Sequence, residues 1–375
     1  MLSGSSLEAL AAASSLTLRS YSSIDFYGNA TIGTRGADGS FGLGKLEFDA
    51  ASLNGATGAH VTIAAGEVLF TNGSGATAPG LGGSGGTLVV NAETITLGTG
   101  AKSVDGFGRV ALEADTAILG RGAGTIDFGS ANLAFAAPLL SAESGAAQDW
   151  TTTGAFQLTG TSSAAAVDTL GARLSITAAS IVQGGRIDLA AGSLSLRATS
   201  GDVVLTSGSV TRAAGVVRNF YDQSLSIAGG RIALTADQGR VDAMAGSLID
   251  LSGSGAKAGT LAIVSAQAAL LDGVLRGDGG GSFTLDTGSI PSFAALADKL
   301  AASGFNGDLS VRLRAGDLTI DGTTRASSFA LAADAGSIVV TGTIDVSGAK
   351  GGTIALSAKQ DLTVAAGARL SANAG

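Results

Sequence analysis

Residues 230–237 read Gly-Arg-Ile-Ala-Leu-Thr-Ala-Asp, and this stretch contains the pattern that decides the fold. Apolar residues alternate with other residues, a small residue follows, and a turn-forming Asp ends the pattern. Alternation with period two, closed by turn residues, is typical of a short strand buried on one face. The same phrase recurs at residues 46–50, 88–92, 110–114, 174–178, 187–191 and 354–358. We therefore predict many short strands of one kind along the chain.

The phrase belongs to longer internal repeats. Residues 108–115 match residues 230–237 at six of eight positions, and residues 249–263 are echoed by residues 344–356. Self-similarity on this scale is the signature of a solenoid, in which each repeat packs only on its neighbours. We predict an all-β, elongated β-solenoid with about 20 residues in each coil.

The composition agrees with an ordered stack of strands. A length of 375 residues suggests two or three globular domains, but one pattern throughout favours a single stack. Gly is abundant at 59 residues, yet 45% of the chain is hydrophobic and only 14% is charged, which is the reverse of a disordered sequence. Only 3 Pro occur, as long ladders require, because Pro cannot donate to a ladder.

The charge and hydropathy exclude several classes of partner. A net charge of -8 leaves no basic stripe for nucleic acid or anionic lipid. The mean hydropathy is +0.39, but no apolar run reaches the roughly 18 residues of a membrane helix, so we expect no membrane insertion. The absence of Cys excludes disulfides and thiolate metal sites.

Two stretches interrupt the pattern and define the predicted organisation. Residues 1–137 form β-helix coils, residues 138–168 form an irregular loop or joint that contains the only Trp, and coils continue over residues 169–375. A short amphipathic helix is inserted at about residues 291–304, where Ser292 can cap its start and Gly304 can end it. Its apolar residues at helical spacing are Phe293, Leu296, Ala297 and Leu300. We interpret this helix as an insertion that covers an apolar patch on the flank of the stack.

The residues that could carry chemistry look structural. His60 is the only His, so His-pair zinc sites and His-dependent triads are nearly excluded, and we expect it to face outward or lie in a turn. Six Asp residues fit the strand pattern: Asp115, Asp237 and Asp334 as turn formers, and Asp127, Asp250 and Asp345 as outward-facing residues. The Gly-rich stretch at residues 82–88 lacks the ligand Asp of a calcium-binding repeat, and residues 279–283 lack it too. We therefore assign no catalytic, cofactor-binding or metal residues and expect no cofactor.

Residues 18–28, 192–196 and 245–253 resemble the shaft of filamentous-haemagglutinin-type exoproteins of two-partner secretion. The resemblance implies a right-handed parallel β-helix, exported through an outer-membrane partner pore and displayed or released as an adhesin. The secretion domain of that family carries an Asn-Pro-Asn-Gly type motif, and no Asn-Pro pair occurs here. The chain thus resembles a fragment of the shaft, for which the family implies no catalytic set.

Two functions remain open at this stage. The first is a non-enzymatic adhesin shaft, extracellular or at the outer-membrane surface, that contacts a glycan or protein receptor. Because neither end looks capped, such a fragment would also associate end to end. The alternative is a β-helix polysaccharide lyase or glycoside hydrolase, which needs clustered carboxylates, basic residues and exposed aromatic rings. Aromatic residues make up only 5% of the chain and are scattered, which favours the shaft.

Overall fold

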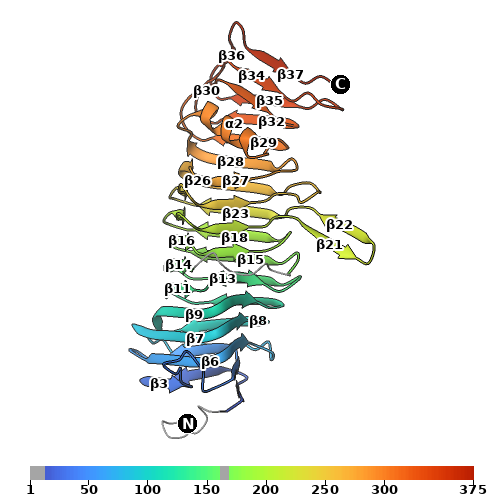
Figure 1. Ribbon diagram of the computed structural model, residues 1–375. Coiled ribbons are helices and arrows are strands. Elements are labelled where there is room, and N and C mark those ends of the chain that lie inside the picture. Colours follow the sequence, from blue (N-terminus) through green and yellow to red (C-terminus); the bar gives the residue numbers. More distant parts are fainter. Residues whose placement is uncertain (1–12, 161–168) are drawn as a thin grey trace. The chain divides into compact units, whose positions relative to one another are not determined.

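The computed structural model describes residues 13–160 and 169–375. It confirms an all-β fold in which parallel strands form a β-solenoid, with one short helix in the described part of the chain (Figure 1). The chain divides into two compact units, of which the first comprises Met1–Leu189 and Gly208–Val210. The second comprises Ala190–Ser207 and Thr211–Gly375.

The first unit is a stack of parallel strands whose inward residues form continuous columns. Its strands are β1 (Ser15–Arg19), β2 (Ser23–Phe26), β3 (Asn29–Ile32), β4 (Lys45–Asp49), β5 (Ser52–Gly55), β6 (His60–Thr71), β7 (Gly86–Leu97), β8 (Gly100–Asp105), β9 (Phe107–Gly120), β10 (Ala123–Asp127), β11 (Asn132–Ala136), β12 (Leu140–Ala142), β13 (Ala147–Thr151), β14 (Phe156–Thr159), β15 (Arg173–Ala178), β16 (Ile181–Gly184) and β17 (Arg186–Asp188). The register places one core column along Ile32, Ile63, Val90, Leu112, Phe135 and Leu158. All six are buried, so the alternation in the sequence becomes a continuous apolar core.

Residues 138–160 differ from the irregular joint that we expected, because they form β12, β13 and β14 and continue the coils. In β13 the inward positions hold Gln148 and Trp150, whose polar atoms weaken the alternation in the sequence. The buried Trp150 ring packs at 6.0 Å from the Phe135 ring, measured between centroids. Residues 161–168, the end of the predicted joint, lie outside the described residues.

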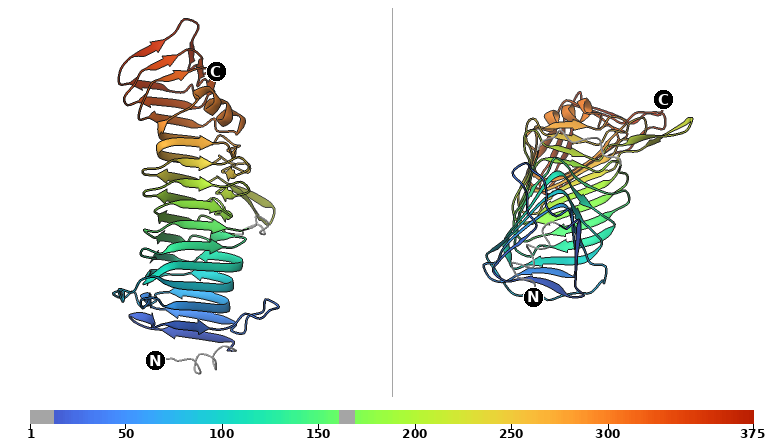
Figure 2. Two further views of the ribbon diagram at one scale, coloured as in Figure 1. Left: turned by 90° about the vertical axis from the view of Figure 1, so that its left-hand side faces the viewer. Right: turned by 60° about the horizontal axis from the view of Figure 1, so that its bottom comes forward.

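The second unit repeats the same architecture (Figure 2). Its strands are β18 (Ser193–Ala198), β19 (Val203–Leu205), β20 (Val210–Arg212), β21 (Val216–Phe220), β22 (Gln223–Ile227), β23 (Arg231–Ala236), β24 (Val241–Ala243), β25 (Leu248–Asp250), β26 (Thr260–Leu271), β27 (Val274–Arg276), β28 (Ser282–Ser289), β29 (Asp308–Leu313), β30 (Leu318–Ile320), β31 (Thr323–Arg325), β32 (Ser328–Ala333), β33 (Ile338–Val340), β34 (Thr343–Asp345), β35 (Ile354–Ala358), β36 (Leu362–Val364) and β37 (Arg369–Ser371). Ile232 and Leu234 are fully buried, as the sequence pattern predicts.

The coils of this unit are more variable in length than the predicted 20 residues. Ser328 pairs with Asp308, 20 residues before it, whereas Arg231 pairs with Ser193, 38 residues before it. The extra residues of the longer coil include β21 and β22, which form a separate antiparallel hairpin. Coil length is free to vary because only the strands must stay in register, while the turns between them can lengthen.

The predicted helix is confirmed as α2 (Phe293–Ala302). The Ser292 side chain accepts a hydrogen bond from the Ala295 N–H at 3.2 Å, and Gly304, with φ +77°, follows the C-cap. α2 buries Phe293 and two further apolar residues, and it contacts β30 and β31. The helix therefore covers apolar surface on the flank of the coils, as expected.

Candidate functional site on the coil surfaces

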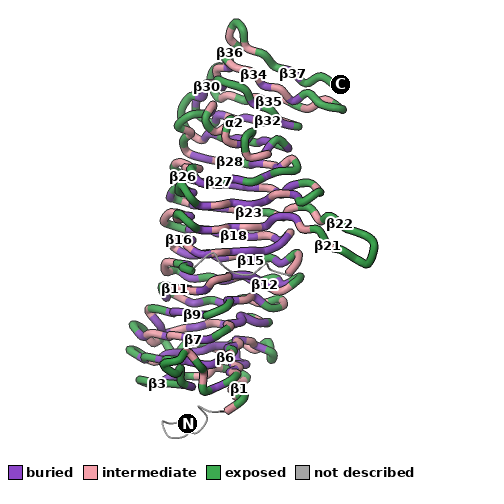
Figure 3. The backbone as a smooth tube through the Cα atoms, in the orientation of Figure 1, coloured by how far each residue is buried: buried purple, intermediate pink, exposed green. Residues whose placement is uncertain are grey.

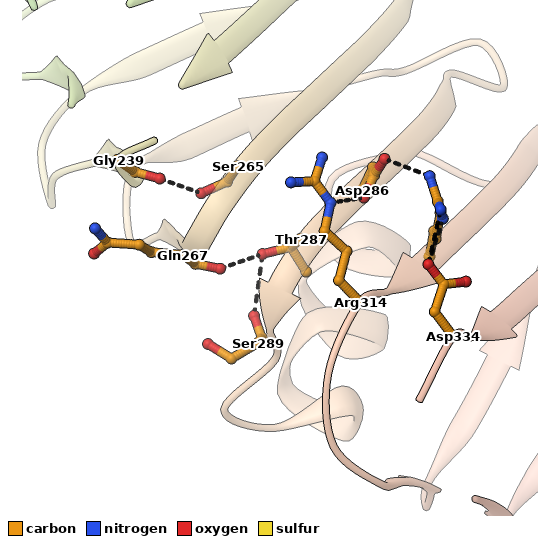
Figure 4. A network of polar contacts seen from close by, with 9 residues as sticks. Gly239, Ser265, Gln267, Asp286, Thr287, Ser289, Arg314 and Asp334 are labelled. Atoms are coloured by element: carbon orange, nitrogen blue, oxygen red, sulfur yellow. Dashed lines mark hydrogen bonds and ion pairs between the residues drawn. The ribbon is translucent and has the colours of Figure 1, made fainter. Parts of the chain in front are cut away.

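A ladder of charged side chains crosses three successive coils of the second unit (Figure 4). The Asp286 carboxylate on β28 accepts hydrogen bonds from Arg314 Nε at 2.6 Å and from Arg312 Nη1 at 3.2 Å. Arg312, on β29, also donates through Nε to Asp334 Oδ2 at 2.9 Å. The hydrogen bond and the charge of Asp334, together with the charge of Asp286, raise the pKa of the Arg312 guanidinium. The guanidinium thus joins carboxylates from the coils on either side of its own.

Next to this ladder, the buried hydroxyl groups of Thr287 and Ser265 bind backbone carbonyls at the turn of the coils (Figure 4). The Thr287 hydroxyl makes short contacts with two carbonyl oxygens, that of Gln267 at 3.0 Å and that of Ser289 at 3.2 Å. The Ser265 hydroxyl similarly donates to the Gly239 carbonyl at 3.3 Å. These bonds satisfy backbone carbonyls where the pairing of β26 with β28 shifts register between Ser265 and Ala268. The whole cluster therefore ties neighbouring coils together.

The three predicted turn carboxylates each pair with an arginine. Asp237 and Asp334 lie just after strands and contact Arg197 and Arg312 respectively. Asp115 lies within β9 instead of in a turn, and it accepts from Arg35 Nη2 at 2.7 Å. That prediction was wrong for Asp115 because β9 runs on without a break past the end of the sequence phrase.

Asp250, expected to face outward, is buried with only 7% of its surface exposed. Its Oδ2 accepts from Arg212 Nε at 3.3 Å, and its Oδ1 accepts from the Ser252 hydroxyl at 2.7 Å. The partner arginine lies 38 residues away, so the strand pattern alone could not reveal this pairing. By contrast, Asp127 is exposed as expected and accepts from the Gly129 N–H.

A polar groove of about 400 Å³ lies beside the last coils, lined by Arg325, Asp345 and Lys350 among others. The pKa of Asp345 is lowered, first by hydrogen bonds from the Ser347 hydroxyl and N–H and then by the charges of two arginines. Asp345 was expected to face outward; it is half-buried at the end of β34, and its lowered pKa keeps the carboxylate ionised as the acceptor of the Ser347 N–H.

The predicted position of His60 is confirmed. It is exposed at the start of β6, and its Nδ1 lies 2.9 Å from the Thr87 hydroxyl on the neighbouring strand. Among the described residues, no group of three or more His, Asp or Glu side chains is placed to hold a metal ion. Within the same residues, no helix is long and apolar enough to cross a membrane.

One charged residue that sequence reasoning missed is Lys102, which lies inside the first unit with 7% of its surface exposed. In register it lies next to Ile126, in the column that continues to Trp150. Its Nζ donates to the carbonyls of Gly98 at 2.6 Å, Gly100 at 3.0 Å and Thr99 at 3.3 Å. Burial lowers the pKa of Lys102 to about 8, because the charged form loses its hydration.

The hairpin formed by β21 and β22 is the most exposed apolar element of the second unit (Figure 3). Phe220 and Leu225 are 59% and 56% exposed, Val217 is also exposed, and Tyr221 is fully exposed. Tyr221 lies in the turn of the hairpin with φ +52°, a backbone conformation that costs a bulky side chain energy and that the pairing of Phe220 with Gln223 imposes. The antiparallel pairing of residues 216–220 with residues 223–227 presents these side chains on a two-stranded hairpin.

Comparisons with known proteins assign no family to the chain. No family model and no curated protein matches it. Among solved structures it is similar to the Tapirin C-terminal domain of Caldicellulosiruptor kristjanssonii, at 12% identity, over 96% of this chain and 92% of that chain. The TM-score of 0.25 is too low for this likeness to carry an argument about function.

Proposed function

We propose that the chain is a structural shaft of a bacterial secreted or surface-displayed adhesin of the filamentous-haemagglutinin type, without enzymatic activity. The parallel solenoid supports this proposal, because a stack of coils buries one continuous core and displays its lateral faces for contact. Several ion pairs in the described coils, such as that of Arg312 with Asp286, join neighbouring strands. Fold alone does not fix function, so the proposal depends on a specific contact element.

The observation that carries the proposal is the exposed hairpin of β21 and β22. Covering exposed apolar and aromatic side chains such as Phe220 and Tyr221 by a partner is favourable, because it removes their apolar surface from water. Exposed Ser and Asn side chains on the same hairpin, with Ser224 donating to Asn219 at 2.7 Å, surround them with polar groups. Aromatic anchors within a polar rim are typical of protein contact surfaces.

Adhesion of protein-coated beads tests this role. Beads that carry the purified chain should be retained on host-cell or matrix-coated surfaces under flow, and a Phe220→Ser, Tyr221→Ser variant should lose most of that retention. Val274→Ser, which removes another exposed apolar side chain far along the chain, is the matched control. Equal retention of both variants and the parent would remove the hairpin from the proposal. Beads that never adhere to any such surface would count against an adhesin.

End-to-end association is a second part of the proposal. In the last described coil, Leu362 and Val364 are 48% and 52% exposed, whereas their register partners Ile338 and Val340 are fully buried. Another coil placed on these side chains would cover them as each inner coil is covered. Sedimentation velocity over a concentration series should show association that a Leu362→Lys, Val364→Lys variant suppresses. A parent chain that stays monomeric throughout would contradict this part.

Export through an outer-membrane partner pore is the third part, and genetics tests it. In the source bacterium, deletion of a pore gene next to the coding region should retain the full-length protein inside the cell. Surface display that is unaffected by every such deletion would contradict the two-partner route while leaving the adhesive role open.

A further inference from the structure

In the coil that begins with β28, the segment after the first strand forms α2. In the next coil, the segment after β29 forms the two short strands β30 and β31. β28 pairs with β26 as far as Ser289, which lies opposite Ala268. If the same register continued, Pro291 would lie opposite Leu270. Proline has no N–H to donate to a ladder, and the chain turns away here to begin α2 after Ser292. The ladder therefore stops, and the last three residues of β26 continue without that neighbour.

These three residues of β26 have an open edge. Ala269, Leu270 and Leu271 pair with β24, and no strand in the described residues pairs with their other side. A strand edge of this kind presents N–H and C=O groups that another strand can bind. The side chains are also incompletely covered. Ala269 and Leu271 are half-buried, whereas their partners on β24, Val241 and Ala243, are fully buried.

A groove of about 230 Å³ separates this edge from α2. Its apolar lining comes from both sides: Leu270, Leu271 and Leu285 from the strands, and Pro291, Ala295 and Leu296 from the helix segment. The volume equals that of about eight water molecules at ~30 Å³ each, which is enough for aliphatic side chains. Leu296 is half-buried, while the other apolar residues on the inner side of α2, such as Phe293 and Leu300, are buried. An apolar occupant would thus complete the cover of Leu296.

We propose that this groove binds an extended peptide segment of a partner protein, which adds a strand to the edge at residues 269–271. A row of backbone donors and acceptors selects another backbone, and the apolar floor selects aliphatic side chains at alternate positions. β30 shows the pattern that fits this place, because it forms the corresponding strand of the next coil with Leu318 and Ile320 buried and Thr319 exposed. Lys299 lies at the helix side of the groove and Asp272 at the strand side, so the end of the peptide next to Lys299 favours an acidic residue.

A synthetic peptide with the sequence of residues 316–322, Gly-Asp-Leu-Thr-Ile-Asp-Gly, is the probe. The chain has no Cys, so Ala302→Cys, at the exposed C-terminal end of α2 and outside the groove lining, accepts a single environment-sensitive dye. We expect saturable binding with a dissociation constant on the order of 100 µM. The amides of residues 269–271 should also become protected from hydrogen exchange when the peptide is present. A peptide with Pro in place of the Thr should bind at least tenfold more weakly, because its central N–H is missing.

Variants locate the binding site. Leu271→Glu and Leu296→Glu should each abolish binding, and Leu296→Glu alone suffices if the strand variant fails to fold, as circular dichroism would show. Leu225→Glu, an exposed apolar position on the hairpin, is the matched control and should bind normally. Equal binding of the proline peptide, unchanged binding by Leu296→Glu, or no binding and no protection up to about 5 mM peptide would overturn the proposal. Self-association that Leu296→Glu abolishes would also overturn it, since the occupant would then be a second copy.

Discussion

Replacement of the buried Lys102 by methionine should change how stability depends on pH. In the folded chain burial lowers the pKa of Lys102 to about 8, while the ordinary value of the unfolded chain is 10.5. Between these values the unfolded state binds more protons, so stability rises with pH through this window. Methionine fills a similar volume and cannot titrate. The variant should therefore lack this part of the rise.

The expected size follows from the two pKa values. Between pH 7 and pH 10 the titration of Lys102 adds about 2.5 kcal/mol to the free energy of unfolding of the parent chain, at ~1.4 kcal/mol for each pKa unit. At pH 7 the variant avoids the cost of a buried charge but loses the three hydrogen bonds from Nζ. The Thr99 carbonyl keeps the Asn72 N–H at 3.0 Å, and the Gly98 carbonyl keeps Gln148 Nε2 at 3.4 Å. Each fully lost bond costs about 1 kcal/mol, so at pH 7 the lost bonds offset only part of the gain from removing the buried charge.

Urea denaturation of both proteins at pH 7, 8, 9 and 10 measures the difference. The parent should gain stability relative to Lys102→Met as pH rises, most steeply above pH 8. Lys359→Met, at an exposed lysine, is the control and should keep a constant difference from the parent. The ¹³Cε chemical shift of Lys102 should titrate near pH 8. A Lys102→Met difference that stays constant within about 0.5 kcal/mol from pH 7 to pH 10 would refute the buried-charge explanation.

Three further predictions concern the core, the charged ladder and chemistry. Leu234→Asp should cost several kcal/mol by burying an unpaired charge, whereas Thr235→Asp should be nearly neutral in thermal melting; comparable losses would show an error in register. Thr287→Val, which removes a buried hydroxyl from the carbonyls of Gln267 and Ser289, should lower stability by about 1 kcal/mol or more. This loss should exceed that from Asp286→Asn, because the Asn oxygen can still accept from Arg314 and the exposed Arg312 retains Asp334. The reverse order would mean that the ion pairs dominate. Purified protein should leave pectin and alginate uncut with or without calcium, and turnover lost on changing one Asp or Arg would favour the lyase or hydrolase alternative.

The strands and the helix could be predicted from the sequence, because patterns within a few neighbouring residues determine them. The alternation at Ile232 and Leu234 predicted both the strand and its buried side, because side chains point to opposite faces with period two. The helix was predicted by its cap at Ser292 and its apolar spacing, which are also local signals. Neither prediction required knowledge of which strands pair.

The features that escaped prediction depend on residues far apart in the chain. Lys102 can occupy an inward position because carbonyls at the turn before it replace water around the ammonium group. No pattern in the neighbouring sequence predicts these contacts. Asp250 is buried because Arg212 from the preceding coil pairs with it. The groove beside α2 arises where Pro291 ends a ladder, and its open edge belongs to β26, a strand about 20 residues earlier.

Distances along one outward column test the parallel stacking most directly. The register places Ala233, Ala262, Thr284, Ser310, Ala330 and Ala355 side by side on successive strands. Since the chain has no Cys, nitroxide labels can be attached to pairs of introduced cysteines, and electron–electron distances then read the stacking. With about 4.8 Å between strands, the pair at Ala233 and Ala330 should lie about 19 Å apart and the pair at Ala233 and Ala355 about 24 Å apart. Distances that do not increase by about 5 Å with the added coil, or a broad distribution for both pairs, would contradict a parallel β-solenoid with this register.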